Sequence, residues 1–382
     1  MPVRLKSSAA VIKMTVAFGC GKVLYGRSVG ASGLAVGEIV FNTSVTGYQE
    51  TITDPSYLDQ IVLFTFPHIG NSGINQQDME SKGSQPAGII TRCFNSATSG
   101  LRLEGSLRRL CRTSGLLVVT GIDTRELTAT IRNSRKMRVC LLTDNNLKIL
   151  PAEVAKASGH DASAHNLTPK ASTFLPQLWF CKEGYVQLNC LRILVIDLGA
   201  KLNIFRNVIR RGCDVIEVGS YAKLTQLLQL QISGILLTNG PGDPRTIRNV
   251  VTNFKRIQAS PLPTLGICLG HQIICLSFGS KVGRLMPGHH GTNHPVKDLK
   301  EGRVLVTSQN HNYSIGLTKA VDGMRVSHIS LFDGSVQGIE TYRHPVAGFQ
   351  GHPEACPGPK DAEHLFDNFI NPMLMRSVCF DA

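Results

Sequence analysis

The chain has 382 residues, enough for two to three domains. Hydrophobic residues make up 42% and charged residues 18%, which excludes disordered and collagen-like chains, and the apolar runs are strand-sized, which argues against a membrane span. Lys and Arg outnumber Asp and Glu by 40 to 27, a net charge of +13, so an acidic partner or nucleic acid has to be considered.

Three regions are expected along the chain. Residues 1–150 predict an N-terminal mixed β/α domain, with short strands near 38–42, 60–66, 88–91 and 115–119 and a helix over 124–132. Residues 151–190 show neither the helical nor the strand periodicity of apolar residues, and they are expected to be a connector. From 191 to 382 strands and helices alternate, which predicts a parallel sheet covered on both faces. Strands are expected at 191–197, 214–218, 232–238 and 263–267, and helices at 201–211, 221–230 and 270–278.

The positive charge is partly concentrated between Arg92 and Arg138. From Arg102 onward no aromatic residue is interleaved there, whereas proteins that bind single strands stack bases on aromatic rings. We therefore favour a solvated or partner-facing surface over polyanion binding, and we expect no nucleic-acid partner.

The compartment is inferred from the N-terminus and the cysteines. Lys13 interrupts the first apolar segment, so neither a signal peptide nor a membrane anchor is expected. The 11 cysteines include no C-x-x-C pair, and zinc ribbons and thioredoxin-type sites therefore have no support. Scattered thiols of this kind are typical of a reducing compartment. We expect a cytoplasmic protein, or one in an organelle stroma if it is plastid-encoded or targeted.

The sharpest chemical signal surrounds Cys268. It stands between a predicted strand and a predicted helix, flanked by Gly266 and Gly270, in the pattern of a nucleophile elbow with sulfur in place of oxygen. The start of the following helix favours a thiolate, and its free N–H groups can stabilise an oxyanion. A buried structural cysteine is the alternative interpretation, and it fits Cys275 better.

A thiolate nucleophile needs a base and a group that orients the base. His352 and Glu354 follow a strand-like segment at 346–350, and Glu354 is expected to hold the imidazole in the right tautomer. His289, His290 and His294 invite a metal site, but the surrounding Gly and Pro residues deny them a helix. We expect no metal there.

These motifs carry a resemblance. Gly266-Ile-Cys-Leu-Gly-His-Gln, Asn239-Gly-Pro-Gly-Asp-Pro and His352-Pro-Glu resemble triad-type (class I) glutamine amidotransferases. A second group of motifs resembles the family of carbamoyl-phosphate synthase small chains: Phe41-Asn-Thr-Ser-Val-Thr-Gly-Tyr-Gln-Glu, Thr53-Asp-Pro-Ser-Tyr, Phe66-Pro-His-Ile-Gly-Asn, Gly121-Ile-Asp-Thr-Arg-Glu-Leu, Gly288-His-His-Gly-Thr-Asn-His-Pro-Val and Ser308-Gln-Asn-His.

The resemblance implies roles for individual residues. Cys268 would attack the side-chain amide of L-glutamine, and His352 would protonate the departing ammonia and then activate water. The oxyanion donors would be the backbone of Gly240 and Leu269. The glutamine contacts would be Ser56, Gly240, Gly242, Leu269, Gln272, Asn310, Asn312 and Tyr313. Ser56 is expected in the N-terminal domain. Asn312 stands where Gly is frequent, and it would serve through its backbone because Asn tolerates left-handed conformations.

The chain has no G-x-x-x-x-G-K-[ST] motif, so no ATP site is predicted in it. The resemblance implies a large synthetase chain that uses bicarbonate and MgATP and receives ammonia through a tunnel. Its product, carbamoyl phosphate, feeds arginine and pyrimidine synthesis. We expect no cofactor in this chain itself. Two alternatives stay open: a glutaminase subunit of another synthase, such as one for GMP or an aminobenzoate, and a catalytically silent regulatory subunit.

Overall fold

The computed structural model describes residues 12–132, 137–143, 165–181, 190–316 and 323–380. The chain forms two compact units. The first comprises residues 1–42, 59–77 and 86–162, and the second comprises 43–58, 78–85 and 163–382. This division differs from the expected boundaries at 150 and 190, because two short segments from the N-terminal third of the chain belong to the second unit.

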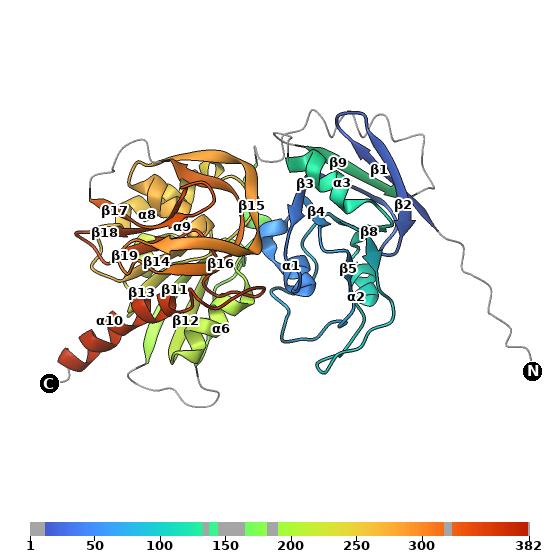
Figure 1. Ribbon diagram of the computed structural model, residues 1–382. Helices are drawn as coiled ribbons and strands as arrows, with labels where there is room; N and C mark the ends of the chain where they lie inside the picture. The colour runs from blue at the N-terminus through green and yellow to red at the C-terminus, as the bar shows by residue number, and fades with distance from the viewer. Residues whose placement is uncertain (1–11, 133–136, 144–164, 182–189, 317–322, 381–382) are drawn as a thin grey trace, which may run out of the picture. The chain divides into compact units, whose positions relative to one another are not determined.

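In the first unit, seven of the described strands close into a barrel in the order β1-β2-β8-β6-β4-β3-β9 (Figure 1). Their bounds are β1 Lys13–Phe18, β2 Val23–Ser28, β3 Leu34–Asn42, β4 Gln60–Phe64, β6 Gly88–Thr91, β8 Leu117–Thr120 and β9 Arg138–Thr143. The strands β3, β4, β6 and β8 run parallel to their neighbours in this series, and the other pairs are antiparallel.

Two of the described helices pack against the strands of this barrel. Helix α3 (Thr124–Arg132) has the predicted bounds, and its Leu127 and Ile131 pack among the buried residues of the strands. Helix α2 (Leu107–Thr113) is capped by Ser106, whose Oγ accepts the N–H of Arg109 at 3.2 Å. The short strands β5 (His68–Ile69) and β7 (Cys93–Phe94) pair with each other outside the barrel.

The second unit contains a sheet of ten described strands in the order β10-β12-β11-β13-β14-β19-β18-β17-β15-β16. The bounds are β10 Gln177–Trp179, β11 Leu191–Asp197, β12 Cys213–Gly219, β13 Gly234–Leu237, β14 Thr264–Ile267, β15 Lys281–Asp298, β16 Val304–Gly316, β17 Met324–Ser330, β18 Val336–Thr341 and β19 Val346–Phe349. The run from β12 to β19 is parallel, and the strands on either side of it are antiparallel. The predicted α/β fold is confirmed.

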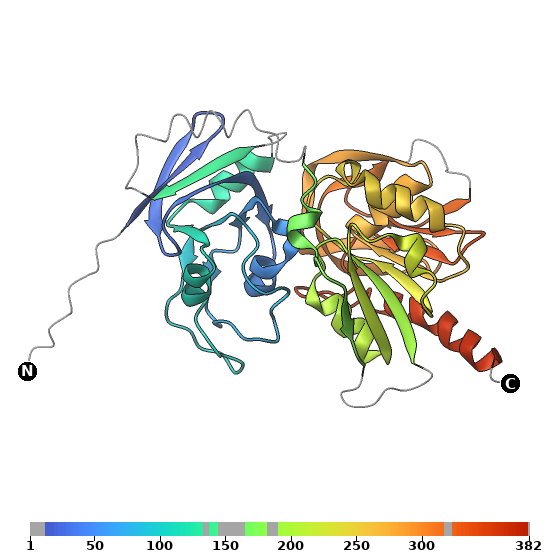
Figure 2. The same ribbon diagram turned by 180° about the vertical axis from the view of Figure 1, so that it is seen from behind.

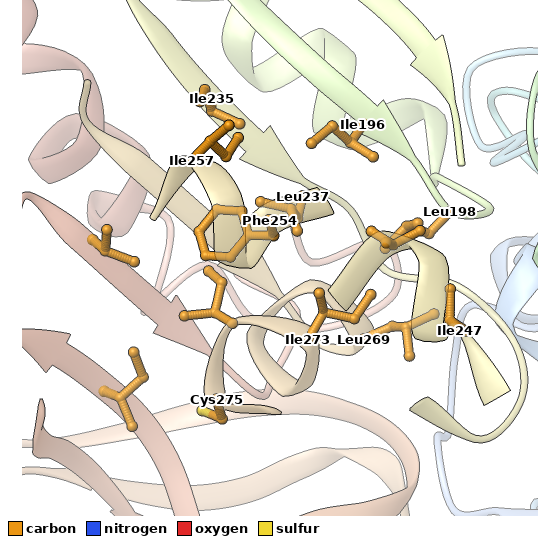
Figure 3. Close-up of a cluster of buried hydrophobic side chains, with 14 of the residues drawn as sticks. Ile196, Leu198, Ile235, Leu237, Ile247, Phe254, Ile257, Leu269, Ile273 and Cys275 are labelled. Atoms are coloured by element: carbon orange, nitrogen blue, oxygen red, sulfur yellow. The ribbon is translucent and has the colours of Figure 1, made fainter. Parts of the chain in front are cut away.

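Helices cover both faces of the parallel strands. Residues of α6 (Leu202–Arg210) and α10 (His364–Phe380) share one buried cluster with one face. Residues of α8 (Arg248–Ile257) and α9 (Leu269–Ser277) share another with the opposite face, as Figure 1 and the view from behind in Figure 2 show. Figure 3 shows this second cluster, in which Cys275 is fully buried as predicted.

Two predictions for this unit need correction or completion. The helix expected at 221–230 is wrong in length, because α7 spans only Leu224–Leu227 in a segment whose side chains are largely exposed. Within the expected connector, the described residues form α5 (Thr168–Ala171) and β10, and the rest of that prediction lies outside the described residues. No described helix is both long and apolar enough to cross a bilayer.

Candidate active site

Cys268 occupies the sharp turn between β14 and α9. Its backbone has φ 52° and ψ −103°, a conformation that residues with a side chain rarely adopt. Two hydrogen bonds hold this turn: the N–H of Cys268 donates to the carbonyl of Phe349 at 2.8 Å, and the N–H of Gln272 donates to the carbonyl of Cys268 at 3.1 Å. The thiol is thus fixed at the carboxyl end of the parallel strands, where such sheets bind ligands.

The two flanking glycines leave no room for side chains. A Cβ on Gly270 would lie 2.3 Å from the carbonyl oxygen of Leu237, and a Cβ on Gly266 would lie 2.7 Å from the carbonyl carbon of Gly270. Both neighbours are backbone atoms that cannot rotate away. The close approach of α9 to β13 and β14 therefore depends on glycine at both positions.

His352 and Glu354 follow β19 and lie side by side in the interior. Nδ1 of His352 is 2.6 Å from Oε1 of Glu354, and both side chains are almost completely buried. The N–H of His352 donates to the carbonyl of Ser308 at 2.9 Å, which ties this loop to β16. The same Glu354 oxygen accepts from Nζ of Lys201 at 3.0 Å. The carboxylate therefore lies between two cationic groups.

Burial and charge act in opposite directions on these groups. Burial alone would lower the pKa of His352, but the Glu354 carboxylate and the Cys268 thiol together outweigh it and the pKa is raised. Burial alone would raise the pKa of Glu354, and Lys201 and His352 reverse this so that it is lowered. The pKa of Lys201 is raised because the charges of Glu354, Asp54 and Glu80 outweigh burial. At neutral pH the imidazole is thus protonated beside an ionised Glu354.

The thiol of Cys268 has polar neighbours on two sides. Its Sγ lies 3.8 Å from the carbonyl oxygen of Asn310 and accepts from Nε2 of Gln350 at 3.7 Å. Among the described residues Nε2 of His352 has no hydrogen-bond partner of ordinary geometry. The Cys268 thiol nevertheless lies close enough to the imidazole to be among the groups that raise its pKa. The structure thus brings Cys268 together with His352, 84 positions further along the chain, and with Glu354, 2 positions after that.

The expected oxyanion donors lie next to the thiol's turn. Leu269 is the first residue of α9, and its N–H therefore has no partner inside the helix. Gly240 follows β13, and a Cβ there would lie 2.2 Å from the carbonyl oxygen of Leu198. Gly242 has φ +97°, a left-handed conformation that favours glycine. The loop after β13 therefore uses glycine where the backbone is closely packed or turns sharply.

Of the expected glutamine contacts, Gln272, Asn310 and Tyr313 lie on α9 and β16. Nε2 of Gln272 donates to the carbonyl of Tyr313 at 2.8 Å and to Oε1 of Gln350 at 3.0 Å, so its amide is used within the protein. The ring of Tyr313 lies under the guanidinium of Arg245, 5.5 Å from its centroid. The bond from Gln272 to Tyr313 fastens α9 to β16.

Ser56 belongs to the second unit, contrary to the expectation that it lies in the N-terminal domain. Its Oγ accepts from Nδ2 of Asn239 at 2.8 Å, and its N–H donates to Oδ1 of Asp54 at 2.8 Å. Asp54 in turn accepts from Nδ2 of Asn310 at 3.1 Å. These buried contacts hold helix α1 (Tyr48–Thr53) and the turn at Pro55–Tyr57 in the second unit.

Asn312 differs from its expectation as well. It lies inside β16 and is not among the residues with positive φ, so left-handed tolerance plays no part. Its side chain instead meets His290, with Oδ1 3.0 Å from Nε2.

The other nitrogen of His290 lies 2.9 Å from Oδ1 of Asn310, and Nε2 of His294 lies 2.8 Å from Oγ of Ser330. Among the described residues, the group with metal-ligand spacing is Cys181, Cys190 and Asp214.

Sequence reasoning missed four polar residues that hold the site: Lys201, Asp54, Asn239 and Gln350. Lys201 is buried at the start of α6, beyond the carboxyl end of β11, and its N–H donates to Oδ1 of Asn239 at 3.1 Å. The available signal was position. Asp54 and Asn239 stand inside two of the motifs quoted above, and Gln350 and Lys201 follow strands β19 and β11. None has a local pattern that distinguishes it from an exposed polar residue.

Comparisons with known proteins agree with the geometry. The family model of class-I glutamine amidotransferases matches residues 194–372, and that of the carbamoyl-phosphate synthase small chain, CPSase domain, matches residues 16–141. A carbamoyl phosphate synthase small chain from Xanthomonas campestris pv. campestris is 41% identical over 362 residues, which cover 92% of this chain and 96% of the relative. One from Pasteurella multocida is 41% identical over 359 residues, 92% of this chain and 93% of the relative.

A solved structure of a glutamine amidotransferase from Thermotoga maritima is 20% identical, with a TM-score of 0.36, over 49% of this chain and 86% of that one. The resemblance drawn from the motifs is confirmed by the family models and by the curated relatives. Since more than nine-tenths of the chain aligns at 41% identity, the chain belongs to the family of carbamoyl-phosphate synthase small chains.

Proposed function

We propose that this chain is the glutaminase subunit of a glutamine-dependent carbamoyl-phosphate synthase, and that Cys268, His352 and Glu354 carry out the hydrolysis. The observation that supports this most directly is the strained backbone of Cys268 at the strand-to-helix turn, next to an imidazole paired with Glu354 at 2.6 Å. A structural cysteine needs neither feature. A thiolate nucleophile needs a base that a third group orients, and the sharp turn of a nucleophile elbow exposes its sulfur.

In the first half-reaction the sulfur of Cys268 attacks the side-chain carbonyl carbon of glutamine. The carbonyl oxygen becomes an oxyanion, which the N–H groups of Gly240 and Leu269 would stabilise. The carbon–nitrogen bond then breaks while the His352 imidazolium donates its Nε2 proton to the departing nitrogen. The products of this step are ammonia and a thioester on Cys268, with a neutral imidazole.

In the second half-reaction the neutral imidazole accepts a proton from water, and the resulting hydroxide attacks the thioester carbon. The carbon–sulfur bond breaks, which restores the thiolate and the imidazolium and leaves the γ-carboxylic acid of the product. That acid releases its proton to solvent and leaves as glutamate. Glu354 keeps its charge throughout and holds the ring through Nδ1. Lys201 stabilises that charge through the same oxygen, 3.0 Å away.

Ammonia in water becomes ammonium and loses its nucleophilic lone pair, so a glutaminase of this kind needs a protected acceptor site. We infer that the acceptor is a large synthetase subunit, which would use bicarbonate and MgATP to make carbamoyl phosphate for arginine and pyrimidine synthesis. The membership of this chain in the small-chain family supports that partner.

The test uses the chain assembled with a large carbamoyl-phosphate synthetase subunit. Cys268→Ser should abolish glutamine-dependent synthesis and leave synthesis from added ammonia unchanged. Cys275→Ser is the matched control, because Cys275 lies in the same helix but is buried in the apolar cluster. Equal loss of both activities in Cys268→Ser would contradict the proposal. Assembly with a different synthase would favour the alternative of a glutaminase subunit for that synthase. Failure of wild-type Cys268 to react with a glutamine-like electrophile in the complex would favour a catalytically silent regulatory subunit.

A further inference from the structure

His290 lies between two amide side chains of the neighbouring strand. In the pairing of β15 with β16 it stands opposite Asn310, in a stretch bounded by irregularities in the pairing on either side. Its Nδ1 lies 2.9 Å from Oδ1 of Asn310, and its Nε2 lies 3.0 Å from Oδ1 of Asn312. Both ring nitrogens are therefore in use, and the ring links two residues that share one face of β16.

The orientation of Asn310 is fixed from its other end. Nδ2 of Asn310 donates to Oδ2 of Asp54 at 3.1 Å. A carboxylate only accepts, so the nitrogen of this amide must face Asp54 and its oxygen must face His290. An amide oxygen also only accepts. Nδ1 of His290 must therefore carry the hydrogen in this contact.

The second contact follows from the first. Burial lowers the pKa of His290, so the ring is neutral at neutral pH and carries a single N–H. With the hydrogen on Nδ1, Nε2 is an acceptor, and it needs a donor from Asn312. A half-turn of the Asn312 amide about its last bond exchanges the oxygen and the nitrogen and supplies that donor without moving any other atom.

The surroundings leave the ring little freedom. A Cβ on Gly288 would lie 2.4 Å from Oδ1 of Asn312 and 2.8 Å from Nε2 of His290, so the strand needs glycine there. The ring of Tyr57 packs 6.4 Å away, centroid to centroid. His290 is 7% exposed. The histidine and both amides thus form one closed group.

We propose that His290 is a positioning residue of the glutamine site, which donates through Nδ1 to Asn310 and accepts at Nε2 from Asn312. The chain Asp54–Asn310–His290–Asn312 fixes the part of β16 that faces the nucleophile, since the carbonyl oxygen of Asn310 lies 3.8 Å from Sγ of Cys268. This inference rests on the proposed glutaminase function for its kinetic consequence, and on the hydrogen-bond geometry and burial of the ring for its tautomer.

The kinetic test compares His290→Asn with His294→Asn in the complex with the large subunit. His294 is the matched control, because it lies on the same strand, is similarly buried, and bonds Ser330 instead. His290→Asn should raise KM for glutamine about tenfold, the scale of one or two lost buried hydrogen bonds, with kcat changed by less than about threefold. Synthesis from added ammonia should stay at the wild-type rate.

The tautomer test needs no activity. Nitrogen-15 NMR of the histidine-labelled chain, with the His290 signal identified by its absence in His290→Asn, should show a neutral ring protonated at Nδ1 from pH 6 to 8. A ring protonated at Nε2, or at both nitrogens, would overturn the proposal. So would an unchanged KM in His290→Asn, or an equal rise in His294→Asn.

These readouts separate the two proposals. If the wild-type chain hydrolyses no glutamine with any partner, the proposed function fails and the NMR result still decides the tautomer. If the wild type is active and KM does not respond to His290→Asn, only the positioning role fails. Should His290→Asn not fold, His290→Gln, whose amide is longer, replaces it, and the wild-type spectrum is assigned from that variant.

Discussion

Lys201 and His352 share one oxygen of Glu354: Nζ of the lysine lies 3.0 Å from Oε1, and Nδ1 of the histidine lies 2.6 Å from it. All three side chains are buried. A carboxylate held by two cations keeps its charge away from water, and its charge in turn keeps the imidazole protonated. The electrostatics of the nucleophile's partner are therefore set by a lysine that is 153 residues away from Glu354 in the sequence.

Replacing Glu354 by Gln should cost both activity and stability. The neutral amide no longer stabilises the His352 imidazolium, and we expect a drop in kcat of about 10³–10⁴-fold, as for the acid of a triad. It also leaves the Lys201 ammonium buried without its closest counter-charge, which should lower the free energy of unfolding by about 3–5 kcal/mol. Glutaminase assays and urea unfolding measure the two effects.

The matched control is Lys201→Met, alone and combined with Glu354→Gln. Removing both charged partners should destabilise the chain less than the sum of the single changes, because no unpaired charge is left. Additive losses in this double-mutant cycle would show that the two side chains are not coupled.

Gly270→Ala should inactivate the enzyme. The new Cβ would lie 2.3 Å from the carbonyl oxygen of Leu237, so α9 must shift away from β13 and carry Leu269 and the turn of Cys268 with it. We expect at least a hundredfold loss of kcat, in line with the effect of small displacements in active sites. Gly283→Ala is the control, since its Cβ would meet no atom within 4 Å. Wild-type glutaminase activity in Gly270→Ala would contradict the assignment of the turn.

The stability of the chain should depend on pH through Glu80. Its Oε2 accepts from the N–H of Asn203 at 2.9 Å and its Oε1 lies 3.3 Å from Arg206, but burial outweighs the nearby cations and raises its pKa to about 7 from the ordinary 4.5. Between these two values the folded chain keeps a proton that the unfolded chain has released. This contribution to stability is therefore complete below pH 4.5 and is lost as pH rises to 7.

Glu80→Gln removes that dependence. Between pH 5 and 7.5 the wild type should lose on the order of 3 kcal/mol more of its unfolding free energy than Glu80→Gln does. Urea unfolding of both chains at a series of pH values measures the difference. Parallel profiles for the two chains would mean that Glu80 has an ordinary pKa in the folded state.

Ser56→Ala should weaken glutamine binding. Oγ of Ser56 accepts from Asn239, so its own hydrogen is available to donate to a ligand. We expect KM for glutamine to rise about tenfold with kcat nearly unchanged. Ser277→Ala is a suitable comparison, because that hydroxyl is buried and donates to the carbonyl of Ile274 in its own helix. If both variants keep the wild-type KM, Ser56 does not contact the substrate.

The elements that the sequence predicted well are those with a strong local pattern. Helix α3 has the predicted bounds because its apolar residues recur at helical spacing, and β11 stands out as an uninterrupted apolar run. Cys268 is recognisable from its two glycines alone. Strand β15 was not predicted, because its segment is rich in His, Gly and Pro and alternates poorly, and it is held by its pairing with β16 and β17.

The polar residues around the site are harder to predict for a different reason. Asp54 and Asn310 are 256 positions apart, and Asn203 reaches the carbonyl of Glu354 across 151. Nothing near Lys201 in the sequence indicates that it will be buried. Such residues acquire their roles from partners that only the completed fold supplies, so a single sequence gives the nucleophile and its base but not the groups that hold them.

The path of the backbone has a practical consequence. It passes from one compact unit to the other after residues 42, 58, 77, 85 and 162. A fragment that starts at 163 or later would carry Cys268 and His352 but would lack Asp54, Ser56 and Glu80. Expression of such a fragment would therefore yield Cys268 and His352 without Asp54, which bonds Asn310, and without Ser56, which bonds Asn239. Dissecting this enzyme by truncation thus calls for circular permutation or co-expressed segments.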